Sequence, residues 1–322
     1  MSDPSTASVV STPGASPTES AAPAAAGQPQ TNEKPRGLLG DAWRDLRRKP
    51  LFWISTTLIV IFLLMAAFPQ LFAQGDPSAG ALERSLNKPG ADGWFGYDLQ
   101  GQDVYARVIY GARASIVVAV LSVIGTLLLG GTMGIIAGYR GGWVDALLSR
   151  IADVFFGLPF VLGAIVILTT FNGSGSGNSK AEIMGLVVVS LTVLSWPVVM
   201  RLMRSSVLAT KEADYIVAAR ALGAGTGRII LKHLLPNCLA PLLVYGTIMV
   251  GSFIGAEATL SFLGVGLKSP VVSWGIMISD GKDFIRVAPG LVFFPAAFLV
   301  TAVLSFVMLG EAVREALDPK LR

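Results

Sequence analysis

Residues 211–237 read KEADYIVAARALGAGTGRIILKHLLPN, a polar stretch interrupted by Gly223, Gly225 and Gly227. On each side lies a stretch apolar enough to cross a bilayer as a helix. The charged segment between them is costly to bury in lipid, so we expect it to lie in water. The stretch therefore predicts a membrane protein with several spans and an aqueous loop at this position.

The composition agrees with a membrane protein. Of the 322 residues, 52% are hydrophobic and 14% are charged, whereas soluble domains carry about 25% charged residues. Basic residues flank the apolar stretches and do not gather in one soluble region, which argues against a nucleic-acid partner. Cys238 and His233 are the single residues of their types, so we expect no disulfide and no metal site built from cysteine or histidine.

Six stretches approach the roughly 20 residues that a helix needs to cross the hydrocarbon core. They are residues 52–73, 115–138, 151–171, 182–200, 239–260 and 288–310. We therefore expect an all-α membrane protein with six transmembrane helices. Pro159 and Pro197 fall inside two of these spans, where they are expected to interrupt backbone hydrogen bonds.

Lysine and arginine predict the orientation of the chain, because they are retained on the cytoplasmic side. With the N-terminus inside, 17 of the 25 Lys and Arg residues lie in the cytoplasm, which predicts that both termini are cytoplasmic. Residues 203–238 then form a cytoplasmic loop, and residues 74–114 form an ordered external cap or linker. Residues 1–37 are rich in Ser, Pro, Ala and Thr and predict a disordered cytoplasmic tail before a membrane domain over residues 38–322.

Small residues recur at four-residue spacing in two of the predicted spans. Gly130, Gly134 and Gly138 do so in one span, and Gly251 and Gly255 in another. Such a face lets helices approach closely in lipid. The spacing predicts either packing within the chain or a seam with a second subunit.

The loop itself predicts a helix, a break and a second short helix. The stretch ATKEADYIVAARALG contains strong helix formers, the glycines permit a break, and RIILKHLL predicts a helix that ends at Pro236. The small Ala218, Ala219 and Ala221 leave a slender surface that another protein could clasp. A plain cytoplasmic connector would explain the same residues, and the residues alone leave both interpretations open.

The stretch VAARALGAGTGRIILKHLLPN resembles the E-A-A-x-x-x-G signature of the permease subunits of ATP-binding-cassette importers. Ala218, Ala219 and Gly223 match the signature, and Val217 stands where that family usually has Glu. The resemblance implies that the loop carries a coupling helix, which docks on a cytoplasmic ATPase subunit. The implied contact comprises Ala218, Ala219, Arg220, Ala221, Leu222, Gly223 and Ala224.

Other stretches resemble the second, C-type permease of oligopeptide and dipeptide importers over residues 40–322. FGYDLQGQDVYARVIYGARASI is similar to that family's external stretch, with Tyr97 and Gln102 in place of Thr and Arg. TLSFLGVGLKSPVVSWGIMISDG and the ending EAVREALDPKLR resemble the same family. The resemblance implies the type I importer permease fold in a bacterial cell membrane, with peptides as cargo.

The same resemblance implies several partners. They are a second homologous permease, which shares the path, cytoplasmic ATP-binding subunits, and an external solute-binding protein that delivers the peptide. The chain itself has no P-loop, because Leu267 separates Gly266 from Lys268 in GVGLKS. We therefore expect a non-catalytic subunit without a cofactor or metal of its own, with ATP bound by the partner subunits.

Glu257 is an isolated acid near the outer end of the fifth predicted span. Acids inside a membrane are functional candidates because burying them is costly, so Glu257 is a candidate for the path or a gate. The alternative is a structurally paired carboxyl group.

For the whole chain, the alternatives are a stand-alone transporter or channel driven by an ion gradient, and a scaffold subunit without a path.

Overall fold

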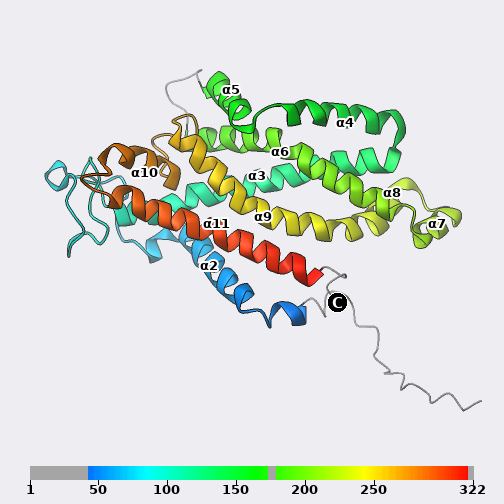
Figure 1. The fold of residues 1–322 in the computed structure, drawn as a ribbon, viewed down its shortest axis with the longest axis horizontal. Coiled ribbons are helices and arrows are strands. Elements are labelled where there is room, and N and C mark those ends of the chain that lie inside the picture. The colour runs from blue at the N-terminus through cyan, green and yellow to red at the C-terminus, as the bar shows by residue number, and fades with distance from the viewer. Residues whose placement is uncertain (1–42, 173–178, 318–322) are drawn as a thin grey trace, which may run out of the picture. The chain divides into compact units, whose positions relative to one another are not determined.

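The computed structural model describes residues 43–172 and 179–317, and the predicted tail over residues 1–37 lies outside this part of the chain. Within it, five helices are long and apolar enough to cross a membrane, where a helix satisfies its own backbone hydrogen bonds. They are α2 (Pro50–Ala67), α3 (Val104–Arg140), α6 (Lys180–Thr210), the run from α8 (Thr226–Ile229) to α9 (Leu235–Phe262), and α11 (Gly290–Leu317). The shorter α7 (Asp214–Ala221) and α10 (Trp274–Gly281) lie at opposite ends of these helices (Figure 1).

A bent pair of helices stands in place of the third predicted span. α4 (Gly142–Gly157) and α5 (Phe160–Asn172) meet at 91°. Between them Leu158 is extended (φ −86°, ψ 123°), as a residue before proline tends to be, and Pro159 cannot continue the hydrogen bonding of α4. A single straight helix over residues 151–171 is therefore not formed; counted as one broken span, the pair brings the candidate crossings to six, as predicted.

Two helices extend beyond their predicted limits. α3 begins at Val104, so residues 104–114 are helical and not part of the external loop. Asp103 caps this helix, because its carboxylate accepts a hydrogen bond from the Tyr105 N–H (2.9 Å). α6 contains Pro197 and continues to Thr210, so the non-helical part of the loop that follows it is shorter than predicted.

The contact between α3 and α6 depends on glycine. A Cβ atom at Gly130 would lie 2.5 Å from the Trp196 carbonyl oxygen, and one at Gly134 would lie 2.6 Å from that of Met200. Gly138 makes a similar approach one turn later. The close packing predicted from the four-residue spacing is thus confirmed within the chain for these three glycines. It also holds for Gly251, where a Cβ would lie 2.9 Å from the Val303 carbonyl oxygen, but not for Gly255, where it would meet nothing within 4 Å.

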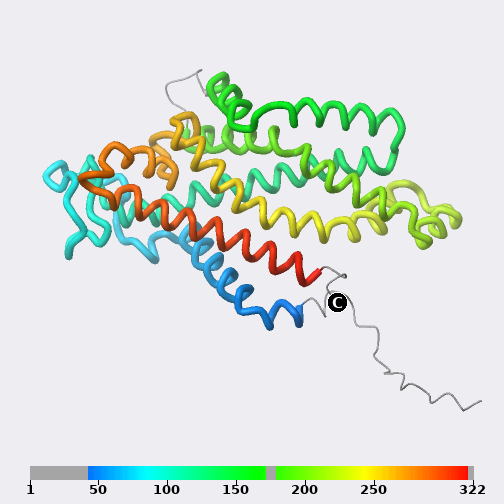
Figure 2. The backbone as a smooth tube through the Cα atoms, in the orientation of Figure 1, coloured from blue at the N-terminus to red at the C-terminus, as the bar shows by residue number. Residues whose placement is uncertain are grey.

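Residues 74–103 fold across the end of the helices at which α3 begins and α10 lies (Figure 2). The two residues that depart from the resembled family's pattern both bind backbone in this cap. The Tyr97 hydroxyl donates to the Asp92 carbonyl (2.6 Å), and the Gln102 side-chain amide donates to the Ser78 carbonyl (3.2 Å). Tyr97 and Gln102, which depart from the family pattern, therefore both stabilise the cap.

We predict that Gly134→Ala destabilises the protein by about 1–3 kcal/mol, because the added methyl group forces α3 away from α6. Gly255→Ala is the matched control, since a Cβ there meets nothing within 4 Å and alanine is the better helix former. Thermal unfolding of both variants in one detergent measures the difference. Equal melting temperatures for the two variants would contradict a glycine-dependent seam.

Candidate functional site

The predicted coupling loop is built from α7 and the start of the α8–α9 run. α7 confirms the helix expected in this loop. The second short helix is not separate, because α8 continues through one π turn (Ile230–Leu234) into α9. Pro236 has no backbone N–H, so it cannot donate a hydrogen bond to the preceding turn. The π turn lies directly before this proline. The predicted break at the glycines is confirmed between α7 and α8, but the prediction that the second helix ends at Pro236 is wrong, because this helix continues into the fifth span.

The end of α7 requires a glycine. The Gly223 N–H donates to the Arg220 carbonyl and the Ala224 N–H donates to the Ala219 carbonyl, both at 3.0 Å. This pair of hydrogen bonds is the Schellman arrangement, which needs a left-handed residue after the helix. Gly223 provides it with φ +82°. The glycine in the E-A-A-x-x-x-G pattern thus ends the helix and reverses the chain.

The residues predicted to contact an ATPase lie together on the last turn of α7 and the turn after it. Ala218, Arg220, Ala221, Leu222 and Gly223 are exposed, and Ala219 and Ala224 are half-buried. Leu222 is 88% exposed, more than any other large hydrophobic side chain in residues 43–172 and 179–317. The structure therefore presents this cluster on the surface with a leucine at its tip.

More apolar side chains surround Leu222 in the loop sequence. Tyr215, Val217 and Leu231 are 47%, 53% and 65% exposed. Exposed apolar groups gathered on an aqueous segment indicate a protein contact. Val217, where the resembled family has Glu, is one of them, so this departure adds apolar surface to the loop.

The base of the loop is fixed to the spanning helices. Ile216 is fully buried (0% exposed). The Asn237 side-chain amide donates to the Tyr215 hydroxyl (3.2 Å), and the Lys211 ammonium donates to the Gly138 carbonyl at the end of α3 (3.2 Å). The exposed tip thus stands on a base that is tied to both α3 and α9.

Ion pairs join α4 to the same end of α6. Arg201 binds Asp153 (2.6 Å) and places its guanidinium 3.9 Å from the centre of the Phe156 ring. Arg204 binds both carboxylate oxygens of Asp145. The two acids and two arginines therefore fix α4 against α6.

Glu257 is fully buried among three serine hydroxyls. Ser261 (2.7 Å) and Ser273 (3.0 Å) donate to its Oε1, and Ser115 (2.9 Å) donates to its Oε2. These serines come from α9, from the N-cap of α10 and from α3. The geometry agrees with a structurally paired carboxyl group that joins three elements, and a part in the path or a gate stays a prediction.

The stretch GVGLKS is folded back on α9. Leu267 is 2% exposed, and its N–H donates to the Ser261 hydroxyl (3.0 Å), so this amide is not free to bind phosphate. Within the described residues, no group of three or more His, Cys, Asp or Glu side chains is placed to hold a metal ion.

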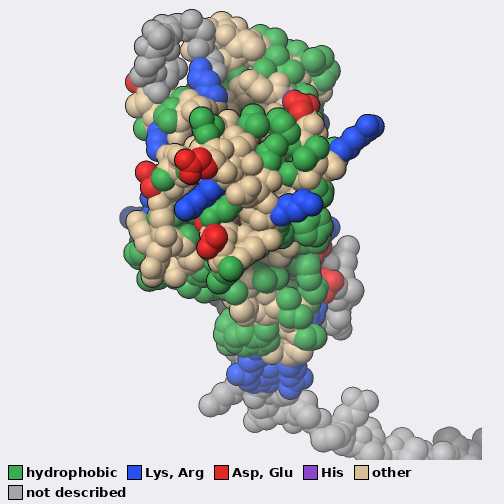
Figure 3. Space-filling view, turned by 90° about the vertical axis from the view of Figure 1, so that its left-hand side faces the viewer, with side chains coloured by type: hydrophobic (Ala, Val, Ile, Leu, Met, Phe, Trp, Pro, Cys, Tyr) green, Lys and Arg blue, Asp and Glu red, His purple; other side chains and the backbone are tan. Residues whose placement is uncertain are grey.

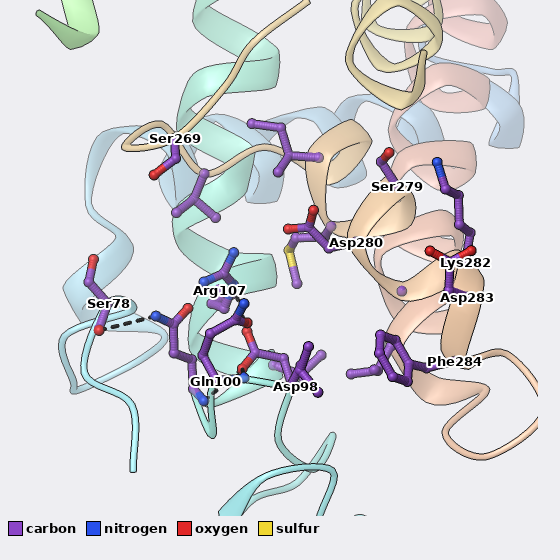
Figure 4. Close-up of a pocket in the computed structure, with 18 of the residues that line it drawn as sticks. Ser78, Asp98, Gln100, Arg107, Ser269, Ser279, Asp280, Lys282, Asp283 and Phe284 are labelled. Carbon is purple, nitrogen blue, oxygen red and sulfur yellow. Dashed lines mark hydrogen bonds and ion pairs between the residues drawn. The ribbon is translucent and has the colours of Figure 1, made fainter. Parts of the chain in front are cut away.

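A pocket of about 760 Å³ opens at the capped end, between residues 78–107 and 269–291. Asp98 and Gln100 from the cap, Arg107 from α3 and Asp280 from α10 lie around it (Figure 4). Arg107 pairs with Asp98 (3.5 Å). The sequence did not indicate this pocket, because its two halves are far apart along the chain.

Asp280 is an acid of this pocket whose surroundings disfavour its charged form. Its partial burial raises the pKa of the carboxyl group above the usual value; Asp98 adds to the rise, while Arg107 and Lys282 offset part of it. An acid with a shifted pKa in a pocket is a candidate for a functional residue. The pocket is therefore a second candidate site, at the opposite end of the helices from α7.

Two family models match the chain. The binding-protein-dependent transport system inner membrane component covers residues 130–322, and the N-terminal TM domain of oligopeptide transport permease C covers residues 37–89.

Several named proteins are similar over most of the chain. The dipeptide transport system permease protein DppC of Alkalihalophilus pseudofirmus is 38% identical, over 88% of this chain and 90% of its own length. The oligopeptide transport system permease protein OppC of Bacillus subtilis is 35% identical, over 94% and 97%. The glutathione transport system permease protein GsiD of Pectobacterium atrosepticum is 33% identical, over 87% and 90%.

Among solved structures, the inward-facing methionine ABC transporter MetNI contains a chain that aligns with a TM-score of 0.52 and 21% identity. The alignment covers 66% of this chain and 96% of that chain. At this identity the likeness concerns the fold alone, and it agrees with the all-α permease fold expected from the sequence.

We predict that Glu257→Ala lowers the stability of the protein by about 2–4 kcal/mol, because buried hydroxyl groups lose their shared partner and a cavity remains. Glu257→Gln keeps the volume and one oxygen acceptor, so it should retain most of the stability. Thermal unfolding in detergent compares the two variants. An Ala variant as stable as the wild type would show that the three serines do not depend on Glu257.

The raised pKa of Asp280 predicts a pH dependence with a definite sign. A carboxyl group with a higher pKa in the folded state binds protons more readily there, so its contribution to stability falls as pH rises through that pKa. We expect Asp280→Asn to melt at a higher temperature than the wild type at pH 8, and the gap to close below the usual pKa of aspartate. A gap that is constant or reversed with pH would contradict the shift.

Proposed function

The chain belongs to the family of binding-protein-dependent transport system inner membrane components, and from this premise we propose that it forms half of the path of an ATP-driven peptide importer. It is a membrane permease with helices for several crossings. Peptide cargo is supported by the relatives, whose names refer to dipeptides, oligopeptides and glutathione. The first two relatives also share nearly the full length of the chain.

The exposed end of α7 is the observation that carries the proposal. We assign it as the coupling helix, which docks in a groove of a cytoplasmic ATP-binding subunit. A coupling element needs an apolar tip for the partner and a fixed base toward the membrane. The loop has Leu222 at its tip, 88% exposed, and Ile216 at its base, 0% exposed.

Partner subunits then supply the energy for transport and the second half of the path. Two cytoplasmic subunits bind and hydrolyse ATP, and a second homologous permease supplies the other half of the path. This chain has no catalytic role and no cofactor of its own. Both termini lie in the cytoplasm of a bacterium, so the α7 end faces the ATPases and the capped end faces outward.

At the outer end, a solute-binding protein docks over the cap and delivers the peptide. The pocket beside Asp280 supports this assignment, because it combines a volume of about 760 Å³ with a partly buried carboxyl group whose pKa is raised by that burial. Asp98 and Arg107, which pair with each other, give this surface both signs of charge.

We predict that Leu222→Asp reduces recovery of the ATP-binding subunit with the tagged chain by tenfold or more. A central apolar contact is worth about 2 kcal/mol or more, and a charge there must be desolvated. Leu82→Asp is the matched control, since Leu82 is 80% exposed in the cap. The measurement is a pull-down from native membranes in mild detergent, with mass spectrometry of the recovered proteins.

Gly223→Pro and Gly225→Ala test whether the positive φ at Gly223 is needed, or whether any change of a glycine in this loop impairs transport. Proline cannot adopt φ +82° and removes the N–H that binds Arg220, so uptake and ATPase recovery should both be lost. Gly225 has a negative φ and an open Cβ position, so its alanine variant should transport normally. If the wild type is recovered without any ATPase and transports on an ion gradient alone, the importer proposal fails and a stand-alone transporter replaces it.

A further inference from the structure

A basic and aromatic segment precedes the first spanning helix. Residues 43–49 read WRDLRRK, with four basic residues and one acid. Arg44, Arg47 and Arg48 are exposed, and basic side chains gather at the lower end of the face in Figure 3, below a band of hydrophobic ones. Trp43 is 53% exposed and Trp53, on the first turn of α2, is 51% exposed.

The structure holds this segment in place against α11. Leu46 and Phe52 are buried together with Ala312 and Ala316. The Trp53 indole N–H donates to the Arg47 carbonyl (3.0 Å). The arginines therefore extend from a fixed backbone and lose little backbone entropy when they bind a ligand.

The arginines are also available for a ligand. Lys49 forms an ion pair with Glu315. Arg44, Arg47 and Arg48 form none with any side chain in residues 43–172 and 179–317. Asp45 is the only acid between them in the sequence, so the surface keeps an excess of positive charge.

The position of the segment along the membrane normal is set by α2. Its 18 residues span about 27 Å at 1.5 Å per residue, close to the roughly 30 Å of a hydrocarbon core. Residues just before Pro50 therefore lie at the level of the lipid headgroups, where tryptophan is also enriched. At that level guanidinium groups meet phosphate, which they bind with two parallel hydrogen bonds.

We propose that Arg44, Arg47 and Arg48, flanked by Trp43 and Trp53, form a binding site for the headgroup of an anionic phospholipid. The arginines bind the phosphate, and the indole rings lie against the upper acyl chains and glycerol backbone. The site ties the start of α2, and through the buried contact the end of α11, to the anionic leaflet. It depends on membrane insertion alone and not on the cargo or the ATPase.

The test uses the full-length protein purified in neutral detergent and titrated with palmitoyl-oleoyl phosphatidylglycerol or phosphatidylcholine, with bound lipid counted by native mass spectrometry. Each basic residue near an anionic surface adds about 1 kcal/mol, so we expect the wild type to prefer phosphatidylglycerol by about tenfold to hundredfold. The combined variant Arg44→Gln, Arg47→Gln, Arg48→Gln should lose this preference.

The matched control is Arg140→Gln, Arg150→Gln, Arg228→Gln, which removes the same charge from three exposed arginines elsewhere and should keep the preference. Unfolding temperatures confirm that both variants are folded, and replacement of the three arginines by lysine should restore part of the binding. A wild type without preference, or a glutamine variant that keeps it, overturns the site. Displacement of the lipid by an equal concentration of glycerol phosphate overturns the lipid assignment in favour of a phosphate site.

Discussion

The close approach of α3 and α6 is the contact on which the rest of the membrane domain depends. In lipid no hydrophobic force draws two helices together, so they associate where small residues let the backbones meet. Gly130 and Gly134 provide this at the Trp196 and Met200 carbonyls. The seam continues to the end of both helices, where Lys211 caps α3 by binding the Gly138 carbonyl. The start of the predicted coupling loop is thereby positioned by the same contact that holds the spans together.

The two candidate sites then occupy opposite ends of one helical framework. At one end a short helix ends in a glycine turn and exposes Leu222. At the other end a cap of residues 74–103 and the segment around α10 enclose a polar pocket. A transporter subunit needs a contact on each side of the membrane and a stiff connection between them. The arrangement places one candidate surface at each end on ordered elements, and the spanning helices connect them.

The sequence predicted the features that arise locally and missed those that arise from packing. Apolar length indicated the spans, helix formers indicated α7, and Gly223 marked a turn that needs positive φ. Asp103 could have indicated the start of α3, since it is a typical capping residue. Pro159 marked a break, but the 91° angle depends on how α5 packs. The surroundings of Glu257 could not be predicted, because Ser115 lies on another helix 142 residues away.

The α8–α9 run joins the two ends of the helical framework. It extends over 37 residues, Thr226–Phe262, which is about 55 Å of helix at 1.5 Å per residue. Its first turns contact α7 through Asn237 and Tyr215, and near its far end Glu257 accepts hydrogen bonds from the serines of α3 and of the α10 cap. Packed protein interiors have low compressibility and transmit strain. Had the loop been joined to the span by a flexible break at Pro236, movement at α7 would have been absorbed there. The π turn keeps the run helical through this point, so the contacts with α7 and the hydrogen bonds of Glu257 lie on one continuous element.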